Sequence, residues 1–189
     1  MWFATRWCSA LSKPTTILTV RSPMPIAIDY QINTDNADGL PNQQQLQRWV
    51  TTAITHAAAD APHKFADAEL TIRVVEKTEG QQLNNEFRGR DYATNVLSFP
   101  FSAPVELPLP LLGDLVVCAD VVKEEAEQQH KALIEHWTHM VIHGTLHLLG
   151  YDHIQDDEAE HMEQPEREIL AALNIADPYQ VSTNTEHNA

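Results

Sequence analysis

Apolar residues recur along the chain with two different periods, and these periods predict where strands and helices lie. Between residues 26 and 32 apolar and polar residues alternate, as they do in a half-buried strand. Between residues 41 and 59 the apolar positions, among them Leu46, Trp49 and Val50, follow the spacing of an amphipathic helix. The spacing of apolar residues therefore distinguishes strands from helices along the chain, and no motif is needed for this.

The same reasoning, applied to the whole chain, predicts four strands and five helices. The strands cover residues 26–32, 70–75, 96–99 and 112–117, and the helices cover residues 41–59, 79–87, 121–130, 134–149 and 156–173. Pro100 is expected to stop the third strand, and Pro165 is expected to break or kink the last helix. Strands and helices are mixed, with no repeat and no linker, so the pattern predicts one α+β domain.

The two ends of the chain differ in composition from the rest. Residues 1–23 contain basic residues, serine and threonine but no acidic residue, and Lys13-Pro14 interrupts the apolar core that a secretory signal needs. Their composition faintly resembles a transit peptide, but a simpler interpretation is a disordered extension or an over-long start, with Met24 as the natural first residue. Residues 24–175 are then the domain, and residues 176–189 a flexible tail.

Charge is distributed unevenly along the chain, whose formal net charge is −15. Residues 1–90 are neutral, and residues 91–189 carry the whole excess of acid, much of it between Asp156 and Glu168. We interpret this acid as a solvated helix face that favours solubility. A polyanion would therefore have to approach through the neutral N-terminal half, where Arg88 and Arg90 lie.

Hydropathy and cysteine content exclude two classes of protein. No stretch approaches the about 18–20 apolar residues of a membrane span. The two cysteines, Cys8 and Cys118, are far apart in the sequence, and Cys118 lies in an apolar run that predicts a buried thiol. The chain is therefore no disulfide scaffold, and we expect it in a reducing compartment, the cytoplasm.

Three histidines near the C-terminal third stand at positions i, i+4 and i+10. The predicted helix places His143 and His147 on one face as neighbours. Gly150 accepts the left-handed conformation that commonly ends a helix, so the chain can then bring His153 back as a third ligand. Three nitrogen ligands with an open fourth position are typical of a catalytic zinc site.

The spacing of these histidines is that of the metzincin proteases, with one departure. In those enzymes a glutamate follows the first histidine and serves as the general base. Gly144 stands at this position here and cannot take a proton from water. The pattern therefore keeps the metal ligands and lacks the peptidase base, which indicates metal-assisted hydrolysis of a different substrate.

A second segment, residues 84–100, contains the end of a helix, a basic turn with Arg88 and Arg90, and a strand. Taken alone, its arginines would be ordinary surface charges. Together with residues 143–153, however, the stretch from about Met24 to Asn174 resembles the YbeY family of bacterial endoribonucleases. The strand Gly113-Asp114-Leu115-Val116-Val117 fits the strand that this family has between the two motifs.

The resemblance implies a zincin-like α+β fold and a single zinc ion bound by His143, His147 and His153. It also implies cleavage of single-stranded RNA in the maturation of ribosomal RNA, including the 3′ end of the small-subunit RNA, and in ribosome quality control. Arg88 matches the functional arginine of the family. Asn95 stands where many members have aspartate, so a carboxylate at that position cannot be essential here.

Several neighbouring side chains are left with alternative roles. His139, one turn before the first ligand, is expected to support the ligands or to pack rather than to close the site, and His136 is expected to be solvated. Asp152 is either a general base or, by preference, a turn residue. Tyr92 and Phe101 offer surfaces on which unpaired bases could stack, although each is more often a core residue.

The expectation drawn from the sequence is a single α+β domain with a small mixed four-stranded sheet and a metal-binding helix that ends at a glycine turn. We expect one Zn²⁺ per chain, although Ni²⁺ also accepts three imidazoles. The expected partners are single-stranded RNA and the ribosome or its proteins, with no membrane, no DNA and a monomeric chain. The alternatives are a metalloprotease-like hydrolase, or a ribosome-associated factor without catalysis whose zinc only stabilises the fold.

Overall fold

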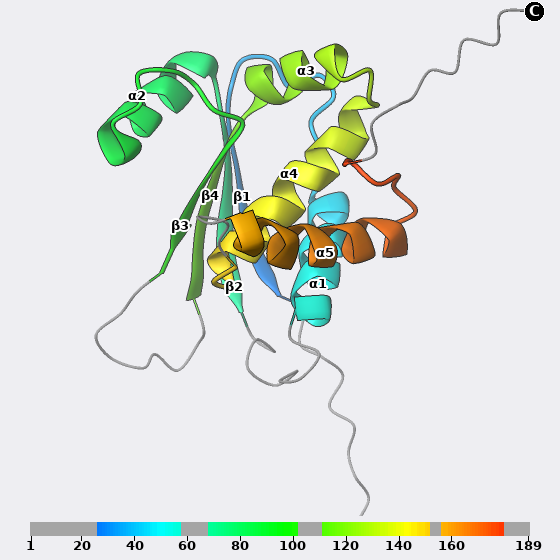
Figure 1. Cartoon of the computed structure of the whole chain (residues 1–189). Coiled ribbons are helices and arrows are strands. Elements are labelled where there is room, and N and C mark those ends of the chain that lie inside the picture. The colour runs from blue at the N-terminus through cyan, green and yellow to red at the C-terminus, as the bar shows by residue number, and fades with distance from the viewer. Residues whose placement is uncertain (1–25, 58–67, 102–110, 152–155, 180–189) are drawn as a thin grey trace, which may run out of the picture.

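The computed structural model describes residues 26–57, 68–101, 111–151 and 156–179, which form four strands and five helices (Figure 1). The strands are β1 (Ala27–Asn33), β2 (Glu69–Val75), β3 (Val96–Pro100) and β4 (Leu111–Cys118). The helices are α1 (Gln43–Ala57), α2 (Lys77–Arg88), α3 (Ala119–Gln128), α4 (Leu133–Leu148) and α5 (Asp156–Ala172). The predicted α+β class and the order of the elements are confirmed.

The strands form one mixed sheet in the order β1-β2-β4-β3. β2 pairs in parallel with both β1 and β4, and β3 pairs antiparallel with β4 at the edge of the sheet. Parallel neighbours need a crossover, which α1 supplies between β1 and β2. The small mixed four-stranded sheet that the sequence predicted is therefore present.

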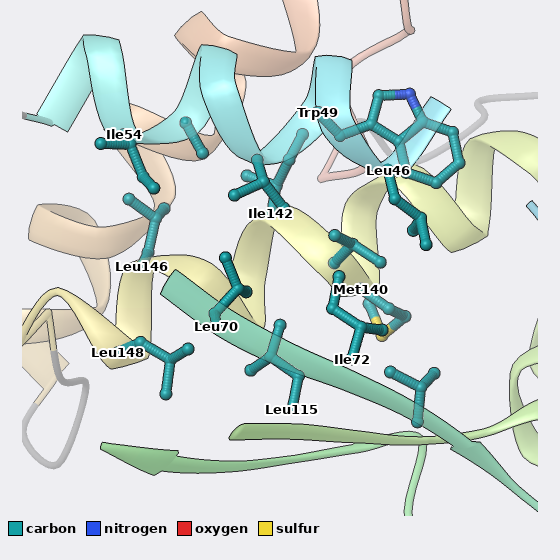
Figure 2. Packing of buried hydrophobic residues seen from close by; sticks show 14 of the residues in the cluster. Leu46, Trp49, Ile54, Leu70, Ile72, Leu115, Met140, Ile142, Leu146 and Leu148 are labelled. Carbon is teal, nitrogen blue, oxygen red and sulfur yellow. The ribbon is translucent and has the colours of Figure 1, made fainter. Parts of the chain in front are cut away.

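Helices α1, α4 and α5 lie on one side of the sheet, with α4 between the sheet and the other two (Figure 1). The main core fills this layer, and Figure 2 shows the side chains of α1, α4 and the sheet that meet there. Leu46 of α1, Ile72 of β2 and Ile142 and Leu146 of α4 are all fully buried. The period-two alternation of β2 supplies one part of this core, since Leu70, Ile72 and Val74 are buried while the residues between them are partly exposed.

A smaller apolar cluster, formed by Val75, Leu97, Val116, Cys118 and Val121, lies apart from the main core. Leu83 of α2 packs against it. Cys118 is 1% exposed, as its apolar surroundings predicted. Among the described helices, none combines the length and the hydropathy that a membrane span requires.

Most boundaries differ from the prediction by one or two residues. α2 begins at Lys77 rather than at residue 79, because its first turn is polar and carries no periodic signal. α3 begins at Ala119, directly after β4. Pro165 lies inside α5 and does not end it. Residues 1–25 and most of the proline-rich segment, 102–110, lie outside the described residues.

The C-terminal segment is described as far as residue 179. Residues 176–179 fall within the predicted flexible tail, yet Tyr179 contacts both α4 and α5. Residues 180–189 lie outside the described residues, so the predicted bounds of the domain remain predictions.

Candidate active site

An open cleft of about 720 Å³ lies between the end of α2, the edge strand β3 and the C-terminal turns of α4. Its lining is more polar than the adjacent core. The described lining residues are Asn84, Arg88, Arg90, Thr94, Asn95, Val96, Leu97, Ser98, Pro100, His143, His147, Gly150 and Tyr151. The cleft thus brings together the two sequence segments that were singled out as motifs.

α4 presents His143 and His147 to this cleft on the same face, as their spacing predicted. Their Nε2 atoms lie 3.1 Å apart, and their rings are nearly perpendicular, at 83°. The helix ends at Leu148, and Gly150 in the turn that follows has a φ of 95°, the left-handed conformation expected of it. The N–H of Gly150 donates to the carbonyl of His147 and that of Tyr151 to the carbonyl of Leu146, which is the Schellman pattern.

The Nδ1 atom of His143 contacts a buried carboxylate of α5. Its partner is Glu166 Oε1, at 2.7 Å, and Glu166 has no exposed surface. Burial raises the pKa of Glu166, but contacts with His139, His143 and Tyr179 outweigh this effect and hold the pKa at about 2. A carboxylate accepts hydrogen bonds, so Nδ1 of His143 is placed at this contact to donate its N–H to Glu166.

The side chains of this cluster suit a transition metal such as zinc. With Nδ1 protonated, His143 has its lone pair on Nε2, the atom that faces His147. Zn–N bonds of about 2.0–2.1 Å in a tetrahedral site place two nitrogens about 3.3 Å apart, close to the separation found here. A carboxylate behind a ligating histidine is also the usual support of a zinc site.

The third predicted ligand, His153, and the predicted base or turn residue, Asp152, lie outside the described residues. In the parts of the chain that are described, no group of three or more histidine, cysteine, aspartate or glutamate side chains could hold a metal. The site assembled from described residues is therefore the His143–His147 pair with its carboxylate partner.

The position of Gly144 explains why no peptidase base stands there. A Cβ at this position would lie 2.9 Å from Leu115 Cδ2 and 3.2 Å from Val96 Cγ2. Residue 144 therefore packs against the sheet, and a side chain there would collide with Leu115 and Val96. A glutamate here could not reach a water molecule beside His143 without displacing α4.

Arg88 lines the same cleft as the two histidines. Its Nη2 donates to the carbonyl of Ser98 at 3.0 Å, and its Cζ lies 6.0 Å from the ring centroid of Phe99. The hydroxyl of Ser98 in turn donates to the carbonyl of Gly144 at 3.3 Å. A chain of two contacts thus connects the arginine to the helix that carries the histidines.

Two expectations about neighbouring residues were wrong. His136 is not solvated: it is 2% exposed, and its Nε2 lies 2.8 Å from Glu125 Oε2 of α3. Tyr92 and Phe101 are not core residues, since they are 53% and 47% exposed. His139, which was expected to support the ligands or to pack, lies with its Nε2 3.8 Å from Glu166 Oε2.

Glu166 was not predicted as a site residue, because the acidic helix that carries it was interpreted as solvated. A signal was nevertheless present. Met162, Ile169 and Leu170 are buried, and they lie three or four residues from Glu166 along the sequence. At this spacing they share one face of the helix with Glu166. A single carboxylate on the apolar stripe of a helix indicates a buried, paired group.

Comparison with known proteins agrees with the resemblance noted in the sequence. The profile of the family described as Endoribonuclease YbeY matches residues 31–174. The chain is 57% identical over 166 residues to Endoribonuclease YbeY of Idiomarina loihiensis, an alignment that covers 86% of this chain and 97% of that protein. The solution structure of TM1509 from Thermotoga maritima is similar at a TM-score of 0.47, with 23% identity over 82% of this chain and 99% of that one. The family match and the relative at this identity show that the chain belongs to the YbeY family of endoribonucleases.

Proposed function

We propose that this protein is a metal-dependent endoribonuclease that cuts single-stranded RNA, with zinc bound by His143, His147 and His153. The observation that carries the proposal is the cleft in which the His143–His147 pair and Arg88 lie together, in a member of an endoribonuclease family. Ribosomal RNA, including the 3′ end of the small-subunit RNA, is the substrate that we infer from the family. Ribosome quality control is the corresponding cellular role.

Phosphodiester cleavage needs a Lewis acid and a cation that binds the phosphate, and different residues of the cleft would provide them. A bound zinc ion would supply Lewis-acid chemistry at a phosphoryl oxygen or an acidified water molecule. Arg88 offers a planar cation that suits the non-bridging oxygens of a phosphate. Its bond to Ser98 uses one of its five N–H donors, so donors remain for the substrate.

The position of Arg88 is set by its neighbours rather than by the substrate. The carbonyl of Ser98 and the ring of Phe99 hold the guanidinium on β3, and Ser98 is itself bound to α4. A donor fixed before the substrate arrives stabilises charge that develops in the transition state without further reorganisation. We therefore assign Arg88 to the phosphate that is being cleaved.

The negative charge of the protein opposes the binding of RNA, which is itself negatively charged. With a net charge of −15, the chain should bind free RNA weakly and with a strong dependence on salt. Docking on a ribosomal subunit through a protein partner would present the RNA to the cleft at a high effective concentration. Co-sedimentation with ribosomal subunits at moderate salt tests this part of the proposal.

The alternative of a metalloprotease is disfavoured by a specific observation. Gly144 packs against Leu115 and Val96, so a glutamate at the position that holds the base in those enzymes would collide with the sheet. A ribosome-associated factor without catalysis, whose zinc only stabilises the fold, differs from the proposal by its lack of cleavage.

The deciding experiment is cleavage of an end-labelled single-stranded RNA by the purified protein and by His147→Ala prepared in the same way. The proposal predicts cleavage by the wild type alone, and the product ends identify the nucleophile, since attack by the 2′-hydroxyl leaves a cyclic phosphate. Equal cleavage by both proteins would identify a contaminant. No cleavage by either, on free RNA or on RNA within a ribosomal subunit, would favour the factor without catalysis.

A further inference from the structure

A carboxylate with no exposed surface lies on the apolar face of α5. Glu166 is enclosed together with Ile169 and Leu170 of the same helix, both of which belong to the main core. Placing an ionised carboxylate in such surroundings is costly unless hydrogen bonds compensate for the lost water. The hydrogen-bond partners of Glu166 should therefore explain why a carboxylate occupies this buried position.

Both oxygens of Glu166 have a partner, and one partner belongs to the candidate active site. Oε1 lies 2.7 Å from Nδ1 of His143, which can donate to it. Oε2 accepts from the hydroxyl of Tyr179 and lies 3.8 Å from Nε2 of His139. Burial and the adjacent carboxylate raise the pKa of Tyr179 well above its usual value, so its hydroxyl keeps its proton and donates.

The segment that carries Tyr179 is itself fastened to the helices. Nζ of Lys131 donates to the carbonyl of Pro178 at 3.1 Å. Arg167 lies with its Cζ 5.0 Å from the ring centroid of Tyr179 and its Nε 3.6 Å from Asp177. The ring of Tyr179 also meets His139 edge to face, at 5.8 Å between centroids. These contacts hold the hydroxyl of Tyr179 against the carboxylate of Glu166.

We propose that Glu166, held by Tyr179, is a positioning residue that locks His143 in the tautomer whose Nε2 lone pair faces the metal. The inference rests on the proposed metal site and adds the residues that prepare one of its ligands. The imidazole alone could carry its proton on either nitrogen, and only one of the two forms can bind a metal through Nε2. The carboxylate selects that form and fixes the ring plane, whether or not a metal is bound.

The size of the effect follows from comparable supports in other metal proteins. Loss of the group behind a ligating histidine typically lowers metal affinity or activity about 10–100-fold. Glu166→Gln keeps the shape of the side chain and removes its charge, so we expect a loss of zinc affinity in that range. Tyr179→Phe removes one donor to Glu166 and leaves the contact with His143, so we expect a smaller loss.

The chain contains a closely matched control. Glu125 lies 2.8 Å from the imidazole of His136, which is also on α4 but is not a candidate ligand. Glu125→Gln therefore removes the same kind of carboxylate–imidazole contact elsewhere on the same helix. It should leave zinc affinity unchanged, within about twofold.

The test uses the full-length protein and two readouts. Zinc affinity is measured by competition with a chromophoric chelator for the wild type and for the Glu166→Gln, Tyr179→Phe and Glu125→Gln variants. The second readout is the ¹⁵N NMR spectrum of the histidines in metal-free protein, with the His143 signals assigned by their loss in His143→Asn. The wild type should show a protonated Nδ1 and an unprotonated Nε2. Glu166→Gln should weaken this preference, because a neutral amide accepts more weakly than a carboxylate and can also donate. A merely structural role of Glu166 would not move the tautomer.

Each outcome decides the proposal. Wild-type zinc affinity together with an unchanged His143 tautomer in Glu166→Gln would overturn it while leaving the metal site intact. If Glu166→Gln does not fold, Tyr179→Phe decides, and a zinc affinity equal to that of the wild type in this variant would overturn the proposal. A wild type that binds no zinc would refute the metal site and the positioning role together.

Discussion

Gly144 lets α4 approach the sheet closely, and replacing it by alanine tests this packing. The added Cβ would lie 2.9 and 3.3 Å from the two methyl carbons of Leu115 and 3.2 Å from Val96 Cγ2. Leu115 has no exposed surface and lies in the centre of the core layer in Figure 2, so it has little room to move. Such overpacking typically costs about 1–3 kcal/mol.

A gain in helix propensity offsets part of this cost. Alanine is favoured over glycine inside a helix by about 1 kcal/mol. We therefore expect Gly144→Ala to lower the free energy of unfolding by about 0–2 kcal/mol. In a Leu115→Ala background the two colliding methyl groups of Leu115 are absent and only Val96 Cγ2, at 3.2 Å, remains close. The same substitution should then cost little, and it should stabilise the protein by up to about 1 kcal/mol where Val96 gives way.

Urea unfolding of the wild type, the two single variants and the double variant measures the coupling between these positions. Leu115→Ala alone should cost about 2–5 kcal/mol, since it empties a fully buried site. The double-mutant cycle should give a coupling energy of about 1–3 kcal/mol. Additivity to within about 0.5 kcal/mol would refute the packing role of Gly144 and, with it, the explanation for the missing peptidase base.

Three further predictions concern the cleft and its surroundings. Arg88→Ala should slow RNA cleavage by about 10²–10³-fold while Arg90→Ala costs far less, as measured under single-turnover conditions, and equal losses would contradict the role of Arg88. Burial raises the pKa of Glu125, but hydrogen bonds from His136 and Asn95 outweigh this effect and lower the pKa below its usual value of 4.5. The stability that ionised Glu125 contributes is therefore lost as the pH falls through the pKa of Glu125 in the folded protein. The difference in unfolding free energy between wild type and Glu125→Gln should therefore shrink below pH 4.5, and a difference that does not change with pH would contradict this. Cleavage of free RNA should fall steeply between about 50 and 200 mM salt, and a flat profile would contradict binding through phosphate contacts.

The sequence predicted the elements well where the apolar period was clear and less well where tertiary surroundings decide. The alternation along residues 26–32 and the helical spacing along α1 were sufficient to predict β1 and α1. Ile28 and Tyr30 of β1 are partly buried while Asp29 between them is exposed, and α1 buries one face. The polar first turn of α2 gave no such signal, so its start was placed two residues late. Boundaries of this kind depend on local contacts that no period records.

The site could be predicted only in part. The spacing of His143 and His147 places them on one helix face whatever the fold, so their convergence needed no structure. His136 was expected to be solvated because it lies off that face, but α4 is packed between the sheet and the other helices and buries residues on nearly every side. Glu166 was missed for the complementary reason, since an acidic helix was assumed to be solvated all round. The sequence pattern did not show which helices pack against α4 and α5, so it could not show which of their polar residues are buried.

The central claim is that one metal ion, bound at the His143–His147 pair, makes this protein a ribonuclease. The most direct test is to strip the protein with a chelator and to measure cleavage of single-stranded RNA while zinc is added back in known equivalents, with His147→Ala as the parallel sample. The account predicts no cleavage by the stripped protein, a rise that ends at one equivalent of zinc, and no recovery in the variant. Full cleavage by the stripped protein, or equal recovery in His147→Ala, would contradict it.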